Sequence, residues 1–223
     1  MEEQKRPLLV PHRTISKRFR RLFHQKYAWW KLLLDPLYDA VAETIIARAQ
    51  PVLDLGCGIG LLAFYLRECK FMLPVRGLDF DSEKIRAANF VAQSYIPVPV
   101  FFQSDLQGDW PEHKGTVTLL DVLQYLPESA RDHLLHKAAA CVAPGGALII
   151  RSGIADGSRR HGITKLIDYL GLRLLWMKSG PASYPTQSWL EEILTPCGLS
   201  LDSSRPLTGA LPLNNHLFVF TRL

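Results

Sequence analysis

The fold is decided by a short apolar run followed by alternating glycines, Val52-Leu53-Asp54-Leu55-Gly56-Cys57-Gly58-Ile59-Gly60. An apolar run of this length, bounded by a turn, is typical of a buried strand, and the apolar run over 61–69 is typical of a helix. Glycines let the backbone turn sharply and let a ligand approach main-chain atoms, because no Cβ intervenes. In an open α/β sheet such a turn lies at the carboxyl edge, where ligands bind. The stretch therefore predicts a strand, a ligand-binding turn and a helix.

The spacing of these glycines excludes two common phosphate-binding loops. A dinucleotide fingerprint would need a third glycine at position 61, which is Leu61, and a P-loop would continue into Gly-Lys-Ser or Gly-Lys-Thr, which does not follow here. Asp54, at the end of the strand, would repel a pyrophosphate, whereas a carboxylate attracts a cationic group. The turn is therefore expected to hold a ligand that carries a positive charge.

Strands and helices alternate after this turn. Apolar runs predict further strands at 75–78, 98–103, 116–121 and 147–152. Helices are predicted at 82–94, with Ser82 as the N-cap, and at 128–142. This alternation predicts an α/β protein whose doubly wound, mostly parallel sheet is covered by helices on both faces. Beyond residue 152 we expect helices at 163–177 and 187–194 and closing strands at 199–202 and 217–221, the last strand antiparallel.

Composition limits the class of protein. The 223 residues are 48% hydrophobic and 21% charged, as in an ordinary globular domain. The four cysteines lie far apart without a Cys-x-x-Cys pair, so no metal site is expected. We expect these cysteines to be buried thiols in a reducing compartment. No apolar run approaches the roughly 20 residues of a membrane-spanning helix, and the start lacks the apolar stretch of a secretory signal. These features predict a cytoplasmic protein.

The net charge of +5 is concentrated at one end of the chain. Residues 1–34 contain nine Lys or Arg and two Glu, giving +7, whereas the remaining 189 residues carry 17 basic and 19 acidic side chains, giving −2. Apolar residues recur at three- and four-residue intervals over 14–34, which predicts a basic amphipathic helix, and a second helix is predicted over 36–49. The chain is therefore expected to divide into N-terminal helices at 1–50 and a domain at 51–223 with an insert at 153–185.

The role of the basic segment at 1–34 stays open among three interpretations. The helix could pack on the domain as part of a lid, since many domains bury such faces. It could contact an acidic partner or the anionic surface of the inner membrane, which would make the protein peripheral there. Binding to nucleic acid, through phosphate contacts and base stacking, is the third and least favoured interpretation.

Acidic residues follow three successive predicted strands. Asp54 ends the first, Asp79 ends the second, and Asp105 follows the third. Their carboxylates could pair with an ammonium, accept both hydroxyls of a ribose and accept a hydrogen bond from a purine amine, respectively. The alternatives are that Asp54 bonds to amides of its own turn and that Asp79 or Asp81 caps the next helix. Together the three acids match the polar parts of S-adenosylmethionine.

At this point the sequence resembles the class I S-adenosylmethionine-dependent methyltransferases, which have a Rossmann-like fold. The resemblance covers residues 51–152 through the segments LDLGCGIG, GLDFD, SDL, LLDVLQYL and APGG, in that order. It implies that S-adenosyl-L-methionine is the cofactor and S-adenosyl-L-homocysteine the product. The glycines would pass under the methionine end, Asp79 would grip the ribose, and the strand-four end would line the transfer site. The implied cofactor-binding set is Asp54, Gly56, Gly58, Gly60, Asp79, Phe80, Asp105, Leu106, Asp121 and Val122.

Candidate residues for the methyl acceptor come from the later strand ends and the insert. Asp121 and Tyr125 are the candidate catalytic residues, because they match the family's active-site loop. The candidate substrate contacts are Arg151, His161, Tyr184 and Asn214. Four of these residues also have a structural alternative: Tyr125 as a sheet-edge aromatic, Arg151 as a surface charge, His161 as part of a solvated turn, and Asn214 as a hairpin residue.

The acceptor itself is predicted only by class. Strand four lacks the Asn/Asp-Pro-Pro-Tyr/Phe segment that marks methylation of nucleobase amines, and the apolar insert suggests a cover over an apolar substrate. We expect a small or acyl-linked aromatic acceptor, either as a free small molecule or linked to a carrier. The sequence also resembles bacterial methyltransferases of aryl-polyene or fatty-acid-like pigment pathways, through Lys-Tyr-Ala-Trp-Trp-Lys-Leu at 26–32 and Asn-Asn at 214–215. An RNA- or ribosome-directed methyltransferase and a non-catalytic scaffold are the alternatives.

Overall fold

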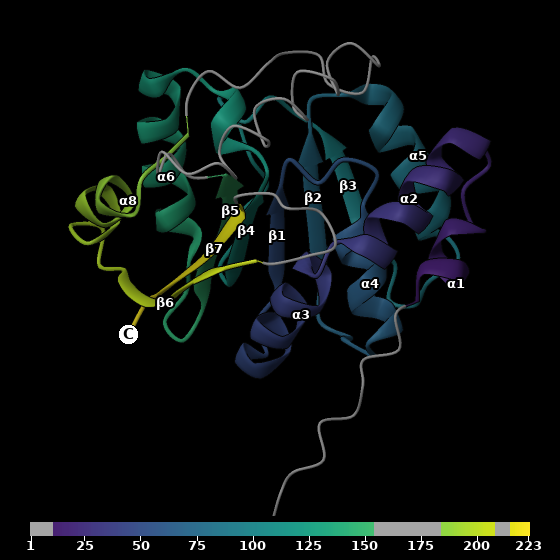
Figure 1. Ribbon diagram of the computed structural model, residues 1–223, viewed down its shortest axis with the longest axis horizontal. Helices are drawn as coiled ribbons and strands as arrows, with labels where there is room; N and C mark the ends of the chain where they lie inside the picture. Colours follow the sequence, from purple (N-terminus) through teal and green to yellow (C-terminus); the bar gives the residue numbers. More distant parts are fainter. Residues whose placement is uncertain (1–10, 154–183, 208–214) are drawn as a thin grey trace, which may run out of the picture.

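The computed structural model describes residues 11–153, 184–207 and 215–223. Its centre is one seven-stranded sheet with the order β3-β2-β1-β4-β5-β7-β6 (Figure 1). The strands are β1 Val52–Leu55, β2 Val75–Asp79, β3 Val100–Gln103, β4 Thr116–Leu120, β5 Ala147–Gly153, β6 Ser200–Pro206 and β7 Asn215–Thr221. The first five are parallel, whereas β7 runs antiparallel to both β5 and β6. This confirms the predicted α/β class and the antiparallel final strand.

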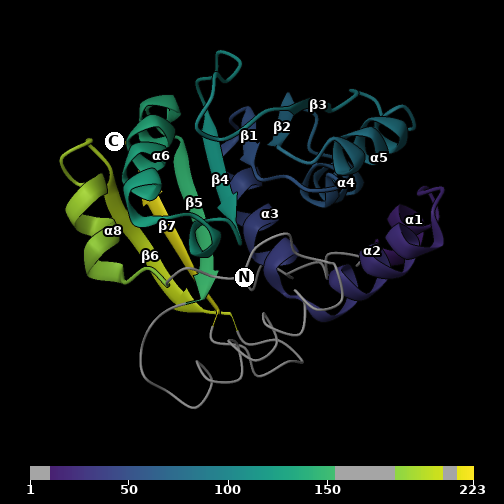
Figure 2. The same cartoon turned by 90° about the horizontal axis from the view of Figure 1, so that it is seen from above.

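Helices cover both faces of the sheet (Figure 2). They are α1 His12–Ser16, α2 Leu22–Leu34, α3 Leu37–Arg48, α4 Leu61–Glu68, α5 Ser82–Ala92, the short 3-10 helix η1 Leu123–Tyr125, α6 Glu128–Cys141 and α8 Gln187–Leu194. Helices α1 to α5 pack on one face of the sheet, whereas α6 and α8 pack on the other.

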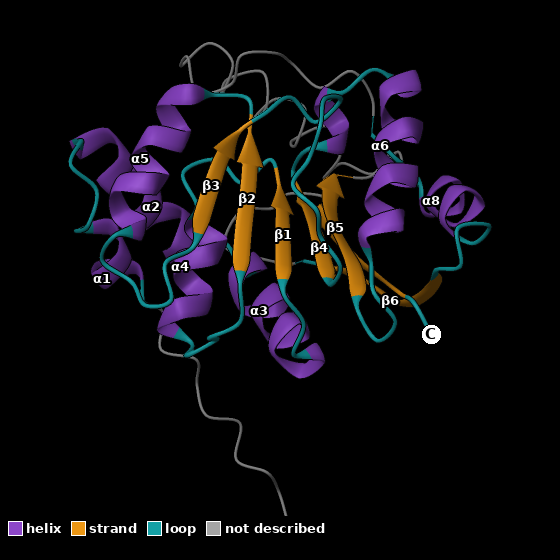
Figure 3. Cartoon of the chain, turned by 180° about the vertical axis from the view of Figure 1, so that it is seen from behind, coloured by secondary structure: helices purple, strands orange, loops and turns teal. Residues whose placement is uncertain are grey.

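Alternate residues along each strand serve the two cores, because successive side chains point to opposite faces. In β5, Ile149 belongs to the core under α1 to α5, and Leu148 and Ile150 belong to the core under α6 and α8. All of β5 is buried. Strand β5, which was predicted from an apolar run, therefore lies between the two cores, and its carboxyl end lies at one edge of the sheet. Figure 3 shows the ends of β1 to β5 together at that edge.

The single helix expected over 14–34 is two helices. Residues 17–21 form a turn between α1 and α2, and the side-chain amide of Gln25 donates to the carbonyl of Phe19 at 2.7 Å. The turn lets Phe19 bury its ring edge-on against Phe64, with ring centroids 6.1 Å apart. Packing against α4 therefore overrides a helical period that continues through the turn.

Two other expectations shift by small amounts, and one lies outside the described residues. The N-cap of α5 is Asp81 and not Ser82, since the Asp81 carboxylate accepts from the backbone amides of Glu83 and Lys84. The closing strands are longer than expected because they pair with each other along most of their length. The helix expected over 163–177 falls outside the described residues. Within the described ranges, every helix is too short or too polar to cross a membrane.

Candidate functional site

The glycine turn after β1 has the backbone conformation that glycine permits. Gly56, Gly58 and Gly60 have φ values of +79°, +57° and +82°. A Cβ on Gly56 would clash with Val122, and one on Gly60 would lie 2.6 Å from the ring of Phe101, so both glycines are required by packing. A Cβ on Gly58 would meet nothing within 4 Å. The turn therefore presents the backbone at Gly58 to open space, where a ligand can reach it.

Asp79 is buried at the end of β2 and is tied to the glycine turn. Its Oδ2 accepts from the amide of Gly58 at 2.8 Å, and its Oδ1 accepts from the amide of Asp81 at 2.9 Å. Helix α5 is capped by Asp81, so the capping alternative for Asp79 is wrong. A carboxylate has about four acceptor sites, and these two bonds leave room for ligand hydroxyls. Asp79 thus holds the turn and stays able to accept from a ligand.

Asp54 is the buried acid beneath the turn. The hydroxyl of Thr118 on β4 donates to its Oδ1 at 2.7 Å. Burial, opposed by this hydrogen bond and reinforced by the nearby Asp79 carboxylate, raises the pKa of Asp54 to about 7. A cationic group bound at the turn would favour the charged carboxylate and so lower this pKa again. The site is therefore poised to accept positive charge.

The end of β3 contributes residues of contrasting exposure. Asp105 is exposed, and its Oδ1 accepts from the amide of Gln107 at 3.0 Å, whereas Leu106 is buried. The amide of Ser104 donates to the carbonyl of Asp79 at 3.1 Å, which links the ends of β2 and β3. Phe80, between these segments, is exposed. A polar acceptor and apolar side chains are thus both present at the strand ends where the sequence predicts an adenine.

Asp121 follows β4 in a strained conformation. Its φ is +60°, a region that costs an L-residue roughly 1–2 kcal/mol. Its amide donates to the carbonyl of Arg151 at 2.9 Å, which ties the ends of β4 and β5 together. The chain then passes Val122, buried against Gly56, and enters η1, which ends at the half-buried Tyr125. Strain held by its surroundings is a frequent property of functional sites.

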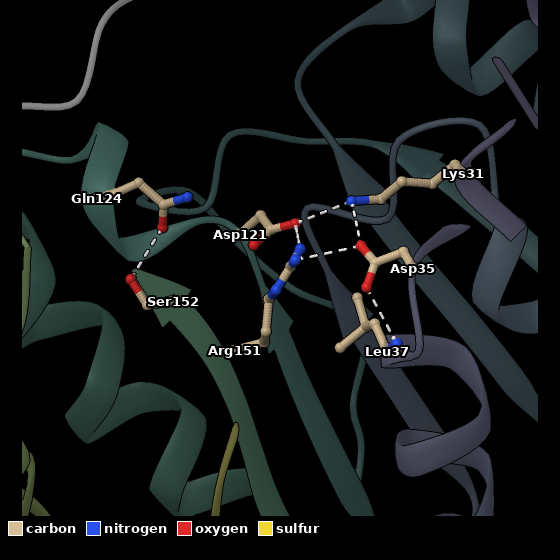
Figure 4. A network of polar contacts seen from close by, with 7 residues as sticks. All are labelled: Lys31, Asp35, Leu37, Asp121, Gln124, Arg151 and Ser152. Carbon is tan, nitrogen blue, oxygen red and sulfur yellow. Dashed lines mark hydrogen bonds and ion pairs between the residues drawn. The ribbon is translucent and has the colours of Figure 1, made fainter. Parts of the chain in front are cut away.

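The Asp121 carboxylate belongs to a network of four charged side chains, which we call the charge network: Lys31, Asp35, Asp121 and Arg151 (Figure 4). The Arg151 guanidinium bonds to Asp121 through Nη1 and lies 3.1 Å from Asp35 Oδ2 through Nη2. Lys31 Nζ lies 2.7 Å from Asp35 Oδ2 and 3.4 Å from Asp121 Oδ2. Two cations and two carboxylates balance, so the network is neutral.

Burial and charge act in opposite directions on this network. Burial lowers the pKa of Arg151, but the carboxylates of Asp121 and Asp35 outweigh it, so the pKa is raised. Burial and the positive charge of Arg151 lower the pKa of Lys31, but the same two carboxylates outweigh both effects and raise it. Burial raises the pKa of Asp35, but the positive charges of Lys31 and Arg151 outweigh it, so the pKa is lowered. All three groups are therefore held in their charged forms, and Arg151 is a buried ion-pair residue and not the surface charge considered as its alternative role.

The remaining predicted site residues are unequally placed. Gln124, which was not predicted, is buried in η1, and its Oε1 accepts from the hydroxyl of Ser152 on β5 at 3.1 Å (Figure 4). Tyr184 is buried just before α8. His161 and Asn214 lie outside the described residues. Among the described residues, no three His, Cys, Asp or Glu side chains gather as they would around a metal ion.

Two residues of the charge network, Lys31 and Asp35, were not predicted from the sequence. Their spacing of four residues on one helix turn was a weak signal, because such pairs are common on exposed helices. The contact of Lys31 with Asp121 spans 90 residues of sequence, and it depends on α2 lying near the ends of β4 and β5. The helix expected to be a lid or a partner contact thus also supplies a side chain to the candidate site.

A family model described as a methyltransferase domain matches residues 20–203. The chain belongs to this methyltransferase family. The match includes α2, the glycine turn and the strand ends described above, and it confirms the family predicted from the sequence. The boundaries proposed for the N-terminal helices and the individual site residues stay predictions.

Three proteins illustrate what this chain is similar to. Ubiquinone biosynthesis O-methyltransferase from Xanthomonas campestris is 26% identical over 151 residues, 62% of this chain and 60% of that protein. Magnesium protoporphyrin IX methyltransferase from Synechocystis PCC 6803 with bound SAH matches with a TM-score of 0.69 and 20% identity, covering 91% of this chain and 88% of the other. The O-methyltransferase NcsB1 from neocarzinostatin biosynthesis has a TM-score of 0.63 and 20% identity, with coverages of 89% and 56%.

The sequence similarity to the Xanthomonas protein covers part of its length. The chain spans about 60% of the length of the Xanthomonas relative. At 20% identity, the two structural matches show a shared fold.

Proposed function

We propose that the protein is an S-adenosylmethionine-dependent methyltransferase that modifies a small-molecule acceptor. The observation that carries this proposal is the arrangement of Asp54, Asp79 and Asp105 at three neighbouring strand ends around the open backbone of Gly58. The family match to residues 20–203 supports it, as does the SAH bound in two similar structures.

Each acid has a role that follows from its surroundings. Asp54, with its raised pKa, responds to the ammonium of the methionine end through the glycine turn. Asp79 accepts from the ribose hydroxyls while its bonds to Gly58 and Asp81 hold it in place. Asp105 accepts from the adenine amine beside Leu106 and Phe80. The cofactor, when bound, supplies a methyl group on a sulfonium, which an acceptor nucleophile can displace.

The residues after β4 and β5 face the acceptor in this proposal. Methyl transfer needs the nucleophile held in line at roughly 3–3.5 Å, more than it needs a nucleophile on the enzyme. Asp121 Oδ2 is engaged by Arg151 and Lys31, so its role is to orient an acceptor hydroxyl through its other oxygen. Tyr125 and Tyr184 supply an aromatic surface for the substrate.

The acceptor that fits best is a small hydroxylated aromatic or acyl-linked molecule. Two of the three similar proteins are named O-methyltransferases, and NcsB1 was solved with 1,4-dihydroxy-2-naphthoic acid. A hydroxyl can donate a hydrogen bond to the Asp121 carboxylate before transfer. His161 and Asn214, from segments outside the described residues, complete the set of proposed substrate contacts.

Calorimetry with S-adenosylhomocysteine tests the cofactor assignment. The wild-type chain should bind it, and Asp79→Asn should weaken binding about 10- to 100-fold, because a charge-assisted hydrogen bond contributes roughly 1.5–3 kcal/mol. Asp132→Asn, on the exposed surface of α6, is the matched control and should bind as the wild type does. A folded wild-type chain that fails to bind would refute the proposed function.

Methyl transfer itself requires a second measurement. Radiolabelled S-adenosylmethionine should label hydroxylated aromatic acids in a panel that also contains amines and RNA. Tyr125→Ala, which removes the aromatic surface, and Asp121→Asn should reduce turnover more than cofactor affinity. Transfer to RNA alone would overturn the small-molecule acceptor and leave the cofactor assignment intact.

A further inference from the structure

Helix α2 exposes an unusually apolar face. Four large apolar side chains have more than a third of their surface exposed: Leu22 at 72%, Phe23 at 57%, Trp30 at 54% and Leu33 at 40%. At 3.6 residues per turn, these residues and the exposed Lys26 fall within an arc of roughly 100° on one side of the helix. We call this arc the docking face: Leu22, Phe23, Lys26, Trp30 and Leu33.

The opposite side of α2 already anchors the helix to the domain. Ala28 and Leu32 are buried in the core that α2 shares with α3 and α4. Lys31 reaches the charge network from that same inner side. The helix is therefore anchored to the domain through its inner side, while the docking face leaves a large apolar area exposed.

The segment that contains the docking face carries an excess of positive charge. Residues 11–34 contain seven Lys or Arg and no Asp or Glu. Three of the cations have partners elsewhere, since Arg18 pairs with Glu68, Arg21 with Glu83 and Lys31 with the charge network. The other four, for which the described residues provide no ion pair, are all exposed: Arg13, Lys17, Arg20 and Lys26.

We propose that the docking face binds the surface of an anionic lipid bilayer. A helix with an apolar side and flanking basic residues lies in the membrane interface, with the apolar side chains in the headgroup region and the cations on lipid phosphates. Trp30 and Lys26 suit this boundary because each has an apolar body and a polar tip. Leu22 and Leu33 favour lipid over nucleic acid, because a leucine offers a base neither stacking nor a hydrogen bond.

The placement of α2 gives this docking a consequence for the site. The helix presents its docking face outward, and from its inner side Lys31 contacts Asp121 at the carboxyl edge of the sheet (Figure 4). A membrane held against α2 would therefore lie on the same element that borders the proposed acceptor position. This consequence rests on the proposed function, whereas membrane binding itself does not.

Cosedimentation of the full chain with vesicles tests the proposal. Vesicles of phosphatidylcholine mixed with phosphatidylglycerol should pellet the protein, vesicles of phosphatidylcholine alone should pellet much less, and added salt should release it. Lys17→Gln and Lys26→Gln should each weaken binding about five-fold, the equivalent of about 1 kcal/mol per basic residue near an anionic surface. Trp30→Ser should weaken it about ten-fold through lost apolar burial.

Two matched controls lie on the far side of the molecule, on the β6 and C-terminal side in Figure 1. Arg205→Gln removes an exposed charge from β6, and Leu223→Ser removes an apolar side chain that is 99% exposed. Both should pellet as the wild type does. The lysine, Arg205 and Leu223 variants should keep the wild-type thermal transition because these side chains are exposed, and the folded state of Trp30→Ser, which loses a ring contact with Trp29, is checked by circular dichroism before the assay.

Three results would overturn the proposal. The first is equal, negligible pelleting with both kinds of vesicle. The second is that the protein binds RNA of mixed sequence but not anionic vesicles, and that Trp30→Ser abolishes the RNA binding. The third is a dimer in sedimentation equilibrium that the docking-face variants dissociate while vesicle binding is absent, which would assign the face to a second copy of the chain. Binding of S-adenosylhomocysteine, measured separately, reports on the proposed function alone.

Discussion

Neutralising Arg151 should destabilise the protein far more than neutralising Lys31, although the two cations contact the same two carboxylates. The side chain of Arg151 is 4% exposed, whereas that of Lys31 is 24% exposed. Removing one partner of a buried ion pair costs about 3–5 kcal/mol, because the remaining charge stays buried without compensation. Arg151→Met should therefore cost about 3–5 kcal/mol, and Lys31→Met, at a partly hydrated position, about 1–2 kcal/mol.

Urea unfolding followed by both circular dichroism and tryptophan fluorescence measures this difference. The midpoint should fall in both variants at an unchanged slope, which would show that stability and not compactness has changed. The double variant should cost less than the sum of the single ones, because the second substitution acts on a network already broken. Equal costs for the two single variants would refute the reasoning, since burial would then not decide the energy of the network.

Three further predictions concern the acids and the glycine turn. Burial raises the pKa of Asp54 to about 7, so binding of S-adenosylmethionine near that pH should release up to one proton, seen as a buffer-dependent calorimetric enthalpy. Gly58→Ala should fold with roughly 1–2 kcal/mol less stability but lose cofactor affinity, whereas Gly56→Ala should lose more stability because its Cβ meets Val122. Asp35 has a lowered pKa, so Asp35→Asn should cost stability fully above about pH 4 and progressively less as the pH falls through the folded-state pKa.

Each of these has a contrary result. A binding enthalpy that does not depend on the buffer would show that Asp54 releases no proton when the cofactor binds. The control is Asp54→Asn, which keeps an acceptor for Thr118 and should show no proton release. Wild-type affinity in Gly58→Ala would place the cofactor away from the turn. A cost of Asp35→Asn that is constant from pH 7 to pH 2 would mean that its charge contributes nothing.

The doubly wound, mostly parallel sheet and its ligand edge could be predicted because local signals agree there. The glycines over 56–60 permit the positive φ values that the turn needs, and the acids after β1, β2 and β3 lie at the ends of parallel strands. Even the closeness of Asp121 and Arg151 follows from β4 and β5 being neighbours, with Leu120 paired to Arg151 in the register. Their mutual ion pair was not predicted, because sequence places side chains at an edge without orienting them.

The N-terminal segment was harder to predict because tertiary contacts decide its structure. The period that predicts one helix over 14–34 continues through residues 17–21, where the burial of Phe19 against Phe64 breaks it. The same period combined residues that the structure separates: Ile15 and Phe19 are buried, whereas Leu22 and Phe23 are exposed. Only the position of the domain could distinguish the inner from the outer side of α2.

The two sides of α2 explain why a single interpretation of the basic segment was insufficient. The inner side packs through Ala28 and Leu32 and reaches Asp121 through Lys31, as a lid-like element would. The outer side keeps its apolar and basic residues in solvent, as a membrane contact would. Because one rigid helix carries both sides, a force that orients the docking face also orients Lys31. In the absence of a membrane, substitutions on the outer side should leave the contacts of the charge network unchanged while they weaken membrane binding, whereas Lys31→Met should break the network and leave membrane binding unchanged.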